Sequence, residues 1–596
     1  MEAAAAVSRM GRRTLLITYS HANLGEMSCN PSIGGVAKGI IVREVDALDG
    51  LMARCADLSG THFKILNASK GSAVHSPRCQ VDRSLYKKAI VDLLAQEKNL
   101  DIIEGEVTDI IVENYCAKGV VLNSNERIFS NSVIVTTGTF LNGIIHIGHD
   151  SFDGGRFWEK PSKELAKFFK TYGFSVGRLK TGTPARLNKY TIDFSKLAIQ
   201  TADDVPVPFS YRIDKIRVPQ VECRMTYTNE NTHKIILDNI QKSAIYGGKI
   251  TGRGPRYCPS IEDKVVRFKD KDRHQIFLES EGIASNVIYP NGISTSLPKD
   301  VQDAFIHSIE GLENCEILRY GYAIEYDYIN PIDLKPTLET KNIKNLFLAG
   351  QINGTTGYEE AAGQGLVAGV NSASERPFIL DRESSYIGVM IDDLTTLGTN
   401  EPYRMFTSRA EFRLFLRTDN ADLRLTEKGI DIGCISKERQ DIFYKRKKLF
   451  EDGKNRLESI SMTSSELEKR GLDVRQDGNI HTLYSLLGHS NIIIKQLENI
   501  FSELLAIDAE TKKSLTIESM YDPYLKRQEQ DIKMLAREKN MIIPDNFDYD
   551  SVGGLTNEVK EKFKLHRPYN IEVASRIAGI TPASIVNVMI ALKNLL

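Results

Sequence analysis

Short hydrophobic runs rich in β-branched residues alternate with longer amphipathic stretches over much of the chain. Buried strands are predicted where such runs occur, at Thr14–Thr18, Ile102–Val112, Val133–Thr136 and Leu346–Ala349. Helices are predicted where helix-forming residues predominate or apolar residues recur every three or four positions, at Glu2–Gly11, Val81–Gln96 and Lys163–Tyr172. Strands and helices that alternate in this way indicate an α/β fold with a parallel sheet.

The residue composition changes at two points further along the chain. From Asn188 to about Glu339 it is rich in Pro, Gly, Thr and Tyr with short strand-like runs, which predicts an inserted domain, since structureless loops of that length are uncommon. After Pro377 charged helical segments follow, at Ser436–Ile460, Tyr521–Lys539 and Asn557–Leu596. We therefore expect an α/β domain of residues 1–195 and 336–380, an inserted domain of residues 196–335 and a helical C-terminal region of residues 381–596.

Composition narrows the class of protein. The 77 basic and 78 acidic residues give a net charge of −1, which excludes a globally basic nucleic-acid coat but allows local basic faces. The 8 cysteines are scattered without CxxC or Cys/His spacing, so we expect no metal site and a reduced, cytoplasmic compartment. No apolar run approaches the ~20 residues of a membrane helix. At the start of the chain Glu2 precedes the alanines and Arg12 follows them, the reverse of a secretory signal.

Two glycine turns follow predicted strands. One is Gly138, after the strand ending at Thr136. The other begins at Gly350, continues through Gly354 and Gly357, and leads into a helix of small residues. Such a turn directs backbone N–H groups and the positive end of a helix towards an anionic ligand, such as a nucleotide cofactor. Tight packing of the helix on the sheet is the alternative that this spacing leaves open.

Seven runs, in colinear order along essentially the whole chain, resemble the MnmG (GidA) family. They are Met27–Gly35, Leu66–Gly71, Gly177–Pro184, Gly254–Lys264, Tyr289–Leu297, Gly350–Ala362 and Glu401–Glu411. The resemblance implies a two-dinucleotide-binding-type flavoprotein that adds a carboxymethylaminomethyl or aminomethyl group to C5 of the wobble uridine of certain tRNAs. It also implies FAD and NADH as cofactors, methylene-tetrahydrofolate as carbon source, and a homodimer that joins an MnmE-type GTPase in a heterotetramer.

The start of the chain departs from the family pattern. Members begin with a strand and a glycine loop that holds the FAD pyrophosphate, whereas Met1–Ala6 stands where that loop would end. We expect about twenty further residues upstream, the usual length of such a strand and loop.

The resemblance assigns cofactor contacts to particular residues. For FAD they are Val107, Ser162 and Gln351, with Gly350 and Gly357 beside them. Val107 as a core strand residue and Ser162 as a helix N-cap are structural alternatives. For NAD they form one stretch: Gly254, Pro255, Arg256, Tyr257, Cys258, Pro259, Ser260, Ile261, Glu262, Asp263, Lys264, Val265, Val266, Arg267 and Phe268.

Two cysteines are the candidate catalytic residues. Cys29 lies in a turn before Gly34 and Gly35, and Cys258 lies between Arg256 and Pro259; a glycine turn or a nearby arginine can supply the conditions that thiolate chemistry requires. Both match family positions proposed to add to uracil C6 or to assist as acid or base; inert buried thiols are the alternative. Four acids near these segments are expected to be solvated at the surface: Glu262, Asp263, Glu359 and Glu360.

Basic residues cluster locally and predict the tRNA contacts. One group is Arg178 and Lys180; another, interleaved with aromatic residues, is Arg404, Arg409 and Arg413. Basic side chains neutralise phosphates, and aromatic rings stack on unpaired bases. A salt-bridged structural role is the alternative for each.

Two alternative functions are also consistent with the sequence. One is a folate- and FAD-dependent tRNA uracil methyltransferase, whose family lacks the long helical region after residue 381. The other is a non-catalytic protein that binds tRNA or a GTPase, as a chain without an FAD loop would be.

Overall fold

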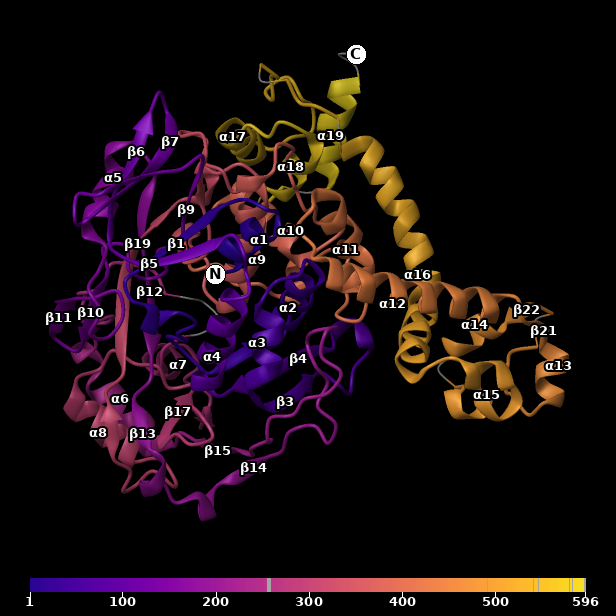
Figure 1. Cartoon of the computed structure of the whole chain (residues 1–596), viewed down its shortest axis with the longest axis horizontal. Helices are drawn as coiled ribbons and strands as arrows, with labels where there is room; N and C mark the ends of the chain where they lie inside the picture. The colour runs from indigo at the N-terminus through magenta and orange to yellow at the C-terminus, as the bar shows by residue number, and fades with distance from the viewer. Residues whose placement is uncertain are drawn as a thin grey trace. The chain divides into compact units, whose positions relative to one another are not determined.

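The computed structural model describes the backbone of residues 1–254, 259–476, 478–489, 491–539, 541–544, 546–577, 579–580 and 582–593, without the side chains of residues 527–539, 582 and 583. The chain forms two compact units, residues 1–445 and 446–596 (Figure 1). Each unit is described below by itself. The domain boundaries expected from the sequence stay a prediction.

Helix α1 (Glu2–Arg9) packs closely against helix α9 (Tyr358–Ala373), although the two are far apart in the sequence (Figure 1). The alanines of α1 are buried, and Gly365 and Gly369 of α9 face them. A Cβ at Gly369 would lie 2.6 Å from the carbonyl oxygen of Ala3. Small residues on both helices therefore allow their backbones to approach.

Replacing Gly369 by alanine is expected to lower the free energy of unfolding by about 1–3 kcal/mol, because the new methyl group meets backbone that does not yield easily. Gly365→Ala is the matched control. Its Cβ would lie 3.6 Å from the Cβ of Glu2, which is ordinary contact, so the gain in helix propensity is expected to leave stability equal or up to about 1 kcal/mol higher. Denaturant unfolding of the two variants measures the contrast.

The predicted strands form two parallel pairs in the first unit. Strand β1 (Thr14–Thr18) pairs with β5 (Leu100–Glu104), and β9 (Val133–Val135) pairs with β20 (Leu346–Leu348). The prediction of one continuous strand over Ile102–Val112 is wrong. The chain leaves β5 at Gly105, whose N–H donates to the carbonyl of Thr18, and β6 (Val107–Glu113) then turns back on β7 (Cys116–Leu122). The hydrophobic run continues through this break, so its pattern could not reveal it.

The other strands of the first unit form antiparallel sheets. The middle of the chain contributes a six-stranded sheet in the order β14 (Ala198–Gln200), β15 (Cys223–Tyr227), β16 (Gln275–Ser280), β17 (Val287–Asn291), β13 (Arg186–Asn188), β18 (Ile317–Arg319). A four-stranded sheet runs in the order β11 (Asp150–Asp153), β10 (Ile144–Ile147), β19 (Tyr322–Ile329), β12 (Val176–Thr183). A three-stranded sheet has β4 (Ser76–Val81) between β2 (Ser32–Gly34) and β3 (Gly60–Leu66).

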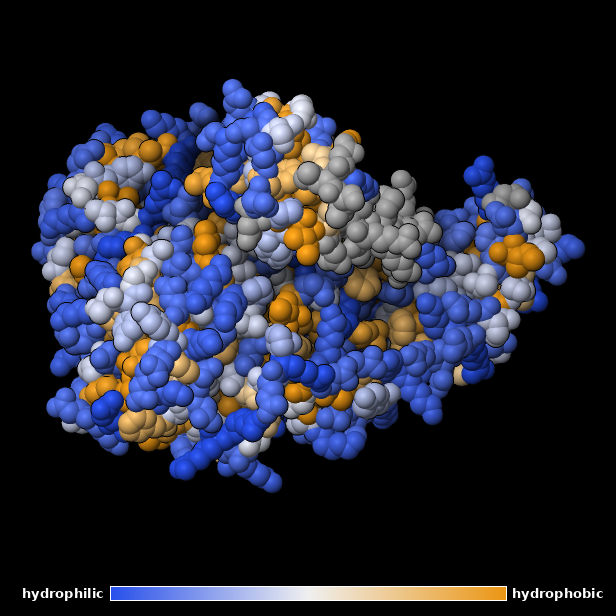
Figure 2. Space-filling view, turned by 90° about the horizontal axis from the view of Figure 1, so that it is seen from above, coloured by the Kyte–Doolittle hydropathy of each residue, from blue (hydrophilic) through white to orange (hydrophobic). Residues whose placement is uncertain are grey.

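Helices complete both units. In the first unit α10 (Tyr386–Leu397) and α11 (Ala421–Ile432) pack on α2 (Lys38–Ala47), and the predicted helices around residues 81–96 and 163–172 are α4 (Arg83–Leu94) and α5 (Lys163–Thr171). The second unit is helical, as predicted, with separate cores around Leu497 and Phe563. Its longer helices are α16 (Ala509–Lys539), α17 (Asn557–His566) and α19 (Pro582–Lys593); α12 (Lys437–Glu458) leads into it. Within the part of the chain that the structure describes, no helix is long and apolar enough to cross a membrane. On the face seen in Figure 2, hydrophobic residues form scattered patches in a mostly hydrophilic surface.

Candidate functional site

The carboxyl ends of β1, β9 and β20 bring together side chains that are far apart in the sequence. Tyr19, just after β1, has its ring 5.6 Å from that of Phe140, which follows the Gly138 turn. Gln351 follows β20, and its side chain comes within 3.6 Å of the position a Cβ would take at Gly138. Gly350, with φ of +88°, adopts a conformation that a larger residue rarely takes. The two glycine turns therefore meet at one edge of the parallel strands.

The other two residues expected to contact FAD lie beside this edge. Ser162 is buried and its Oγ is 2.7 Å from the hydroxyl oxygen of Tyr19. It occupies the N-cap position of α5 but makes no side-chain capping bond, so capping does not account for its side chain. Val107 begins β6, two residues after the Gly105 N–H that binds the end of β1. Both positions fit a ligand lying across the strand ends.

Three buried polar atoms on the glycine turns have no hydrogen-bond partner among the described residues. They are Oγ1 of Thr137, Oδ1 of Asn353 and Oγ1 of Thr356. Buried polar atoms in native proteins are nearly always satisfied, so unmatched atoms at one edge indicate a ligand with its own donors and acceptors. The polar edge of a flavin ring and the ribityl hydroxyls of FAD supply such groups. The residues present thus fit FAD.

Buried charges lie at the first turn of α9. The Nζ of Lys38 is 2.9 Å from Oε2 of Glu359 and 2.9 Å from Oε2 of Glu360. Burial alone would lower the pKa of Lys38, but the two carboxylates outweigh it and raise that pKa. Gly357 directly precedes this turn, with φ of +132°, and a Cβ there would lie 2.1 Å from Lys38 Nζ. Only glycine leaves room for the ion pairs.

The expectation that the four acids are solvated at the surface is wrong. Glu359 and Glu360 are buried in the ion pairs with Lys38, and Glu359 also accepts the N–H of Gly34 at 2.7 Å. Glu262 and Asp263 are buried as well; Glu262 accepts the N–H of Ser296 at 2.8 Å. Each carboxylate finds donors from distant parts of the chain, which outweigh the cost of removing it from water.

Cys29 is half-buried beside the start of α9. Its N–H donates to the hydroxyl oxygen of Tyr358, the first residue of α9, at 2.7 Å, and its carbonyl accepts from Arg83. The Sγ of Cys29 is 3.3 Å from the hydroxyl oxygen of Tyr289. Burial raises the pKa of Tyr358, which keeps that hydroxyl neutral. The candidate thiol is thus held against the helix that begins at the glycine turn.

The stretch assigned to NAD is only partly described. Pro255, Arg256, Tyr257 and the candidate catalytic Cys258 lie outside the described residues. Gly254 lies against the side chain of Lys180, and Ser260 caps helix α7 (Ile261–Arg267) by accepting the Asp263 N–H. Ile261 and Val265 belong to the core of the inserted region, and Phe268 at the helix end is exposed. The NAD role of this stretch stays a prediction.

The first group of residues predicted to contact tRNA, Arg178 and Lys180, forms ion pairs within the protein. Arg178 Nη1 is 2.5 Å from Oδ1 of Asp327, and its Nη2 is 3.1 Å from Oε2 of Glu325. Lys180 is buried, with Nζ 4.0 Å from Oδ2 of Asp263. Acidic partners from β19 and α7 therefore offset much of the charge that the sequence offered to a phosphate.

The second predicted tRNA group is more open. Arg413 is exposed, whereas Arg404 and Arg409 are half-buried. Arg409 lies over the ring of Tyr403, 4.2 Å from its centre, and Arg409 Nη1 is 3.6 Å from Oδ2 of Asp393. The carbonyl of Tyr403 accepts the N–H of Thr356 at 2.8 Å, so this segment is joined to the Gly357 turn. The structure thus places Arg404–Arg413 next to the candidate cofactor edge.

Several residues of the site were missed from the sequence. Tyr289, Tyr358 and Lys38 each lie inside one of the seven family-like runs or just after one. Their position in these runs was the only sign in the sequence that they could belong to the site. Asp393 lies in no such run, yet it binds the Tyr403 hydroxyl at 2.8 Å and Arg382 at its other oxygen. Only the fold brings these partners together.

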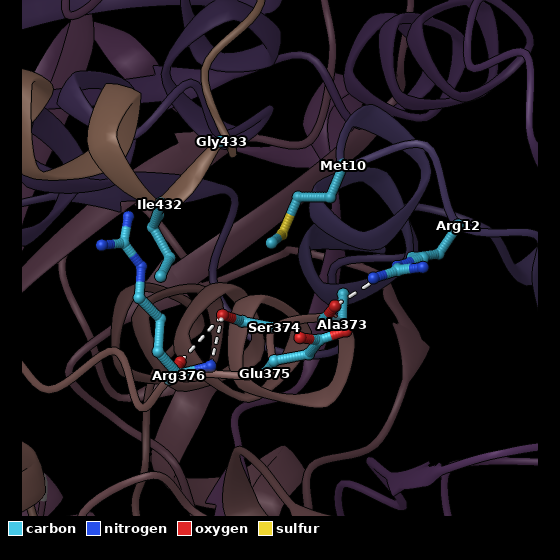
Figure 3. Close-up of a pocket in the computed structure, with 8 residues that line it drawn as sticks. All are labelled: Met10, Arg12, Ala373, Ser374, Glu375, Arg376, Ile432 and Gly433. Atoms are coloured by element: carbon cyan, nitrogen blue, oxygen red, sulfur yellow. Dashed lines mark hydrogen bonds between the residues drawn. The ribbon is translucent and has the colours of Figure 1, made fainter.

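One pocket of about 470 Å³ lies away from this site (Figure 3). It is formed where α1, α9 and α11 end, and Arg12 donates there to the carbonyl of Ala373 at 3.4 Å. Because α9 has 16 residues, its two ends are roughly 24 Å apart. The pocket therefore lies at the end of α9 opposite the glycine turn and is not the candidate cofactor site.

Family models match nearly the whole chain. Residues 1–376 match "Glucose inhibited division protein A", residues 437–529 match the "tRNA modifying enzyme MnmG/GidA C-terminal helical domain", and residues 531–595 match the MnmG/GidA "C-terminal helical bundle".

Curated relatives and solved structures agree with these matches. A "tRNA uridine 5-carboxymethylaminomethyl modification enzyme MnmG" from Granulibacter bethesdensis is 49% identical over 98% of this chain and 94% of its own. An enzyme of the same name from Thermodesulfovibrio yellowstonii is 48% identical over 99% and 96%. The structure of Aquifex aeolicus GidA has a TM-score of 0.88 at 44% identity, covering 99% of this chain and 96% of that one. This similarity confirms the predicted fold class.

Proposed function

Because the chain belongs to the MnmG/GidA family, we propose that it is a flavin-dependent enzyme that adds a carboxymethylaminomethyl or aminomethyl group to C5 of the wobble uridine of certain tRNAs. The observation that carries the proposal is the bond between the Cys29 N–H and Tyr358, the first residue of α9. It places a half-buried thiol beside the helix start where the flavin ring is expected. A thiol that adds to uracil C6 would activate C5 close to the cofactor.

The cofactors follow from the same site. The glycine turns, Ser162, Val107 and Gln351 would hold FAD, which supplies electron transfer when bound. We propose NADH as its reductant and methylene-tetrahydrofolate as the carbon source. Arg83 and Tyr358 hold the backbone of Cys29 on both sides, and Tyr289 positions the thiol. Cys258 is proposed as the partner acid or base.

We further propose that the protein is a homodimer and that its second unit docks an MnmE-type GTPase to form a heterotetramer. Exposed hydrophobic residues on that unit support a docking role: Val586 and Ile590 lie four residues apart on α19, and Leu565 and Tyr569 are exposed near the end of α17. Residues four apart share one face of a helix, as a partner interface requires. The long helical region also favours this family over the methyltransferase alternative.

The visible absorption spectrum of the purified chain tests the cofactor assignment. The proposal predicts a flavin spectrum, either as isolated or after added FAD is taken up and excess is removed. A chain that neither carries nor takes up flavin would instead favour the non-catalytic alternative.

Removing one arginine from each of the two predicted tRNA-binding groups distinguishes their roles. Arg413→Ala should weaken tRNA binding and reduce the slope of log affinity against log salt by about 1, because one exposed phosphate contact is lost. Arg178→Ala should leave the salt slope nearly unchanged, since its guanidinium is already paired with Asp327 and Glu325. Filter binding across a salt series measures both. Equal slopes of log affinity against log salt for Arg413→Ala and the unmodified chain would show that Arg413 does not contact the tRNA.

A further inference from the structure

The only tryptophan of the chain, Trp158, is 87% exposed. It lies in a tight turn between β11 and α5. The turn is closed by a hydrogen bond from the Glu159 N–H to the carbonyl of Arg156 at 2.9 Å. A bidentate ion pair between the side chains of the same two residues reinforces it. A large hydrophobic side chain is therefore presented to solvent by a rigid support.

The backbone at Trp158 is strained. Its φ is +65°, a left-handed conformation that bulky residues rarely adopt and that glycine adopts without cost. Strain of this kind persists where the surrounding structure enforces it and is concentrated at functional sites. The turn would form more readily with glycine, so its stability does not explain the tryptophan.

The exposed ring contacts Phe157, which in turn packs against an aromatic and a basic side chain. The Phe157 ring lies 4.8 Å from the Trp158 ring and is stacked on Tyr322 at 5.6 Å. Arg319 lies over Phe157, 5.8 Å from its centre, and its buried Nε has no hydrogen-bond partner among the described residues. Burial and the nearby Arg186 lower the pKa of Arg319.

Arginine side chains outnumber their acidic partners at this place. Arg83 and Arg186 both pair with Glu281, at 3.1 and 2.6 Å, and both lie close enough to Arg319 to affect its titration. Arg83 Nη1 also lies 4.0 Å from Oε1 of Glu26, so two carboxylates face this cluster of three guanidinium groups. Such a cluster favours an anionic group beside the aromatic rings.

The turn is also connected to the candidate catalytic cysteine. Arg156 Nη1 donates to Oγ of Ser28, the residue before Cys29, at 3.3 Å. Arg83, a member of the arginine cluster, donates to the carbonyl of Cys29 itself. The exposed ring and the thiol are therefore held by one continuous set of contacts.

We propose that Trp158 is a stacking platform for an unpaired base of the tRNA anticodon loop, a neighbour of the base that reaches Cys29, and that Arg319 binds the phosphate of that nucleotide. An exposed ring stacks on any base, and the Arg319 guanidinium over the neighbouring Phe157 ring would bind the phosphate of that nucleotide. The inference rests on the proposed tRNA substrate and adds the residues that would hold its anticodon loop.

Because Trp158 is the sole tryptophan, its fluorescence reports this stack directly. The full chain is titrated with a tRNA anticodon stem–loop, and binding is measured in parallel by filter retention. Quenching that follows the binding curve is expected, with none from a fully paired RNA of equal length. Binding without a change in fluorescence would overturn the platform and leave the proposed function standing. Absence of binding by both methods would overturn the two together.

Substitutions of Trp158 distinguish a role in stacking on a base from a role in the stability of the fold. Trp158→Ala should weaken stem–loop binding about tenfold, the loss expected for one base–aromatic stack, and Trp158→Phe should keep most of the affinity. Tyr115→Ala is the matched control, since Tyr115 is 73% exposed in a hairpin with φ of +56°. Trp158→Gly should raise Tm while weakening binding. A lower Tm with unchanged binding would identify Trp158 as a structural residue and overturn the proposal.

Discussion

Replacing Lys38 by methionine is expected to lower the free energy of unfolding by about 3–5 kcal/mol, because it leaves the carboxylates of Glu359 and Glu360 buried and uncompensated. The same change places two adjacent negative charges at the helix start beside the candidate flavin site. We therefore also expect weaker retention of FAD, which carries negative charge on its pyrophosphate. Denaturant unfolding and flavin content of the purified variant measure the two effects.

The control for this prediction is Lys88→Met. Lys88 pairs with Asp92 at 2.5 Å, but its side chain is 70% exposed, so its loss should change stability by no more than about 1 kcal/mol. A second change, Glu360→Gln in the Lys38→Met background, should recover part of the stability by removing one buried charge. Equal unfolding midpoints for Lys38→Met and Lys88→Met would contradict the account of the buried ion pairs.

Cys29→Ser is expected to reduce tRNA modification by about 10³-fold or more, because the hydroxyl is a far weaker nucleophile than the thiolate. Stability and flavin content should change little, since the backbone bonds from Arg83 and Tyr358 do not involve the sulfur. Mass spectrometry of nucleosides from the reacted tRNA gives the activity.

Cys116→Ser is the matched control for Cys29→Ser. Cys116 is also half-buried, and its sulfur accepts a hydrogen bond from the Asn345 side chain away from the glycine turns. Its replacement should leave activity within about twofold, as expected for a site with no part in the reaction. Full modification activity of Cys29→Ser would show that the Cys29 thiol is not the nucleophile.

Local pattern was sufficient to predict much of the fold. The strands at Thr14–Thr18 and Leu346–Ala349 were predicted from their own residues, because burial and glycine turns affect the residue types over a few positions. The break at Gly105 was not predicted, because the decisive contact comes from Thr18, far away in the sequence. Sequence pattern therefore described the elements better than their pairing.

The same limit applies to the site. Glu359 and Glu360 look like solvated residues in the sequence, and only the approach of Lys38 from α2 explains their burial. Arg178 looks like a phosphate ligand until Asp327 and Glu325 are placed beside it. Charge in a sequence indicates what a residue could bind, whereas the fold decides which partner it has.

An enzyme that modifies the wobble uridine leaves its product in cellular tRNA. Mass spectrometry of nucleosides compares total tRNA from cells in which the gene is deleted with that from cells in which it is restored. We expect 5-carboxymethylaminomethyl uridine and its derivatives to disappear on deletion, to return with the unmodified chain, and not to return with Cys29→Ser. An unchanged level of these nucleosides in the deleted cells would contradict the proposed function.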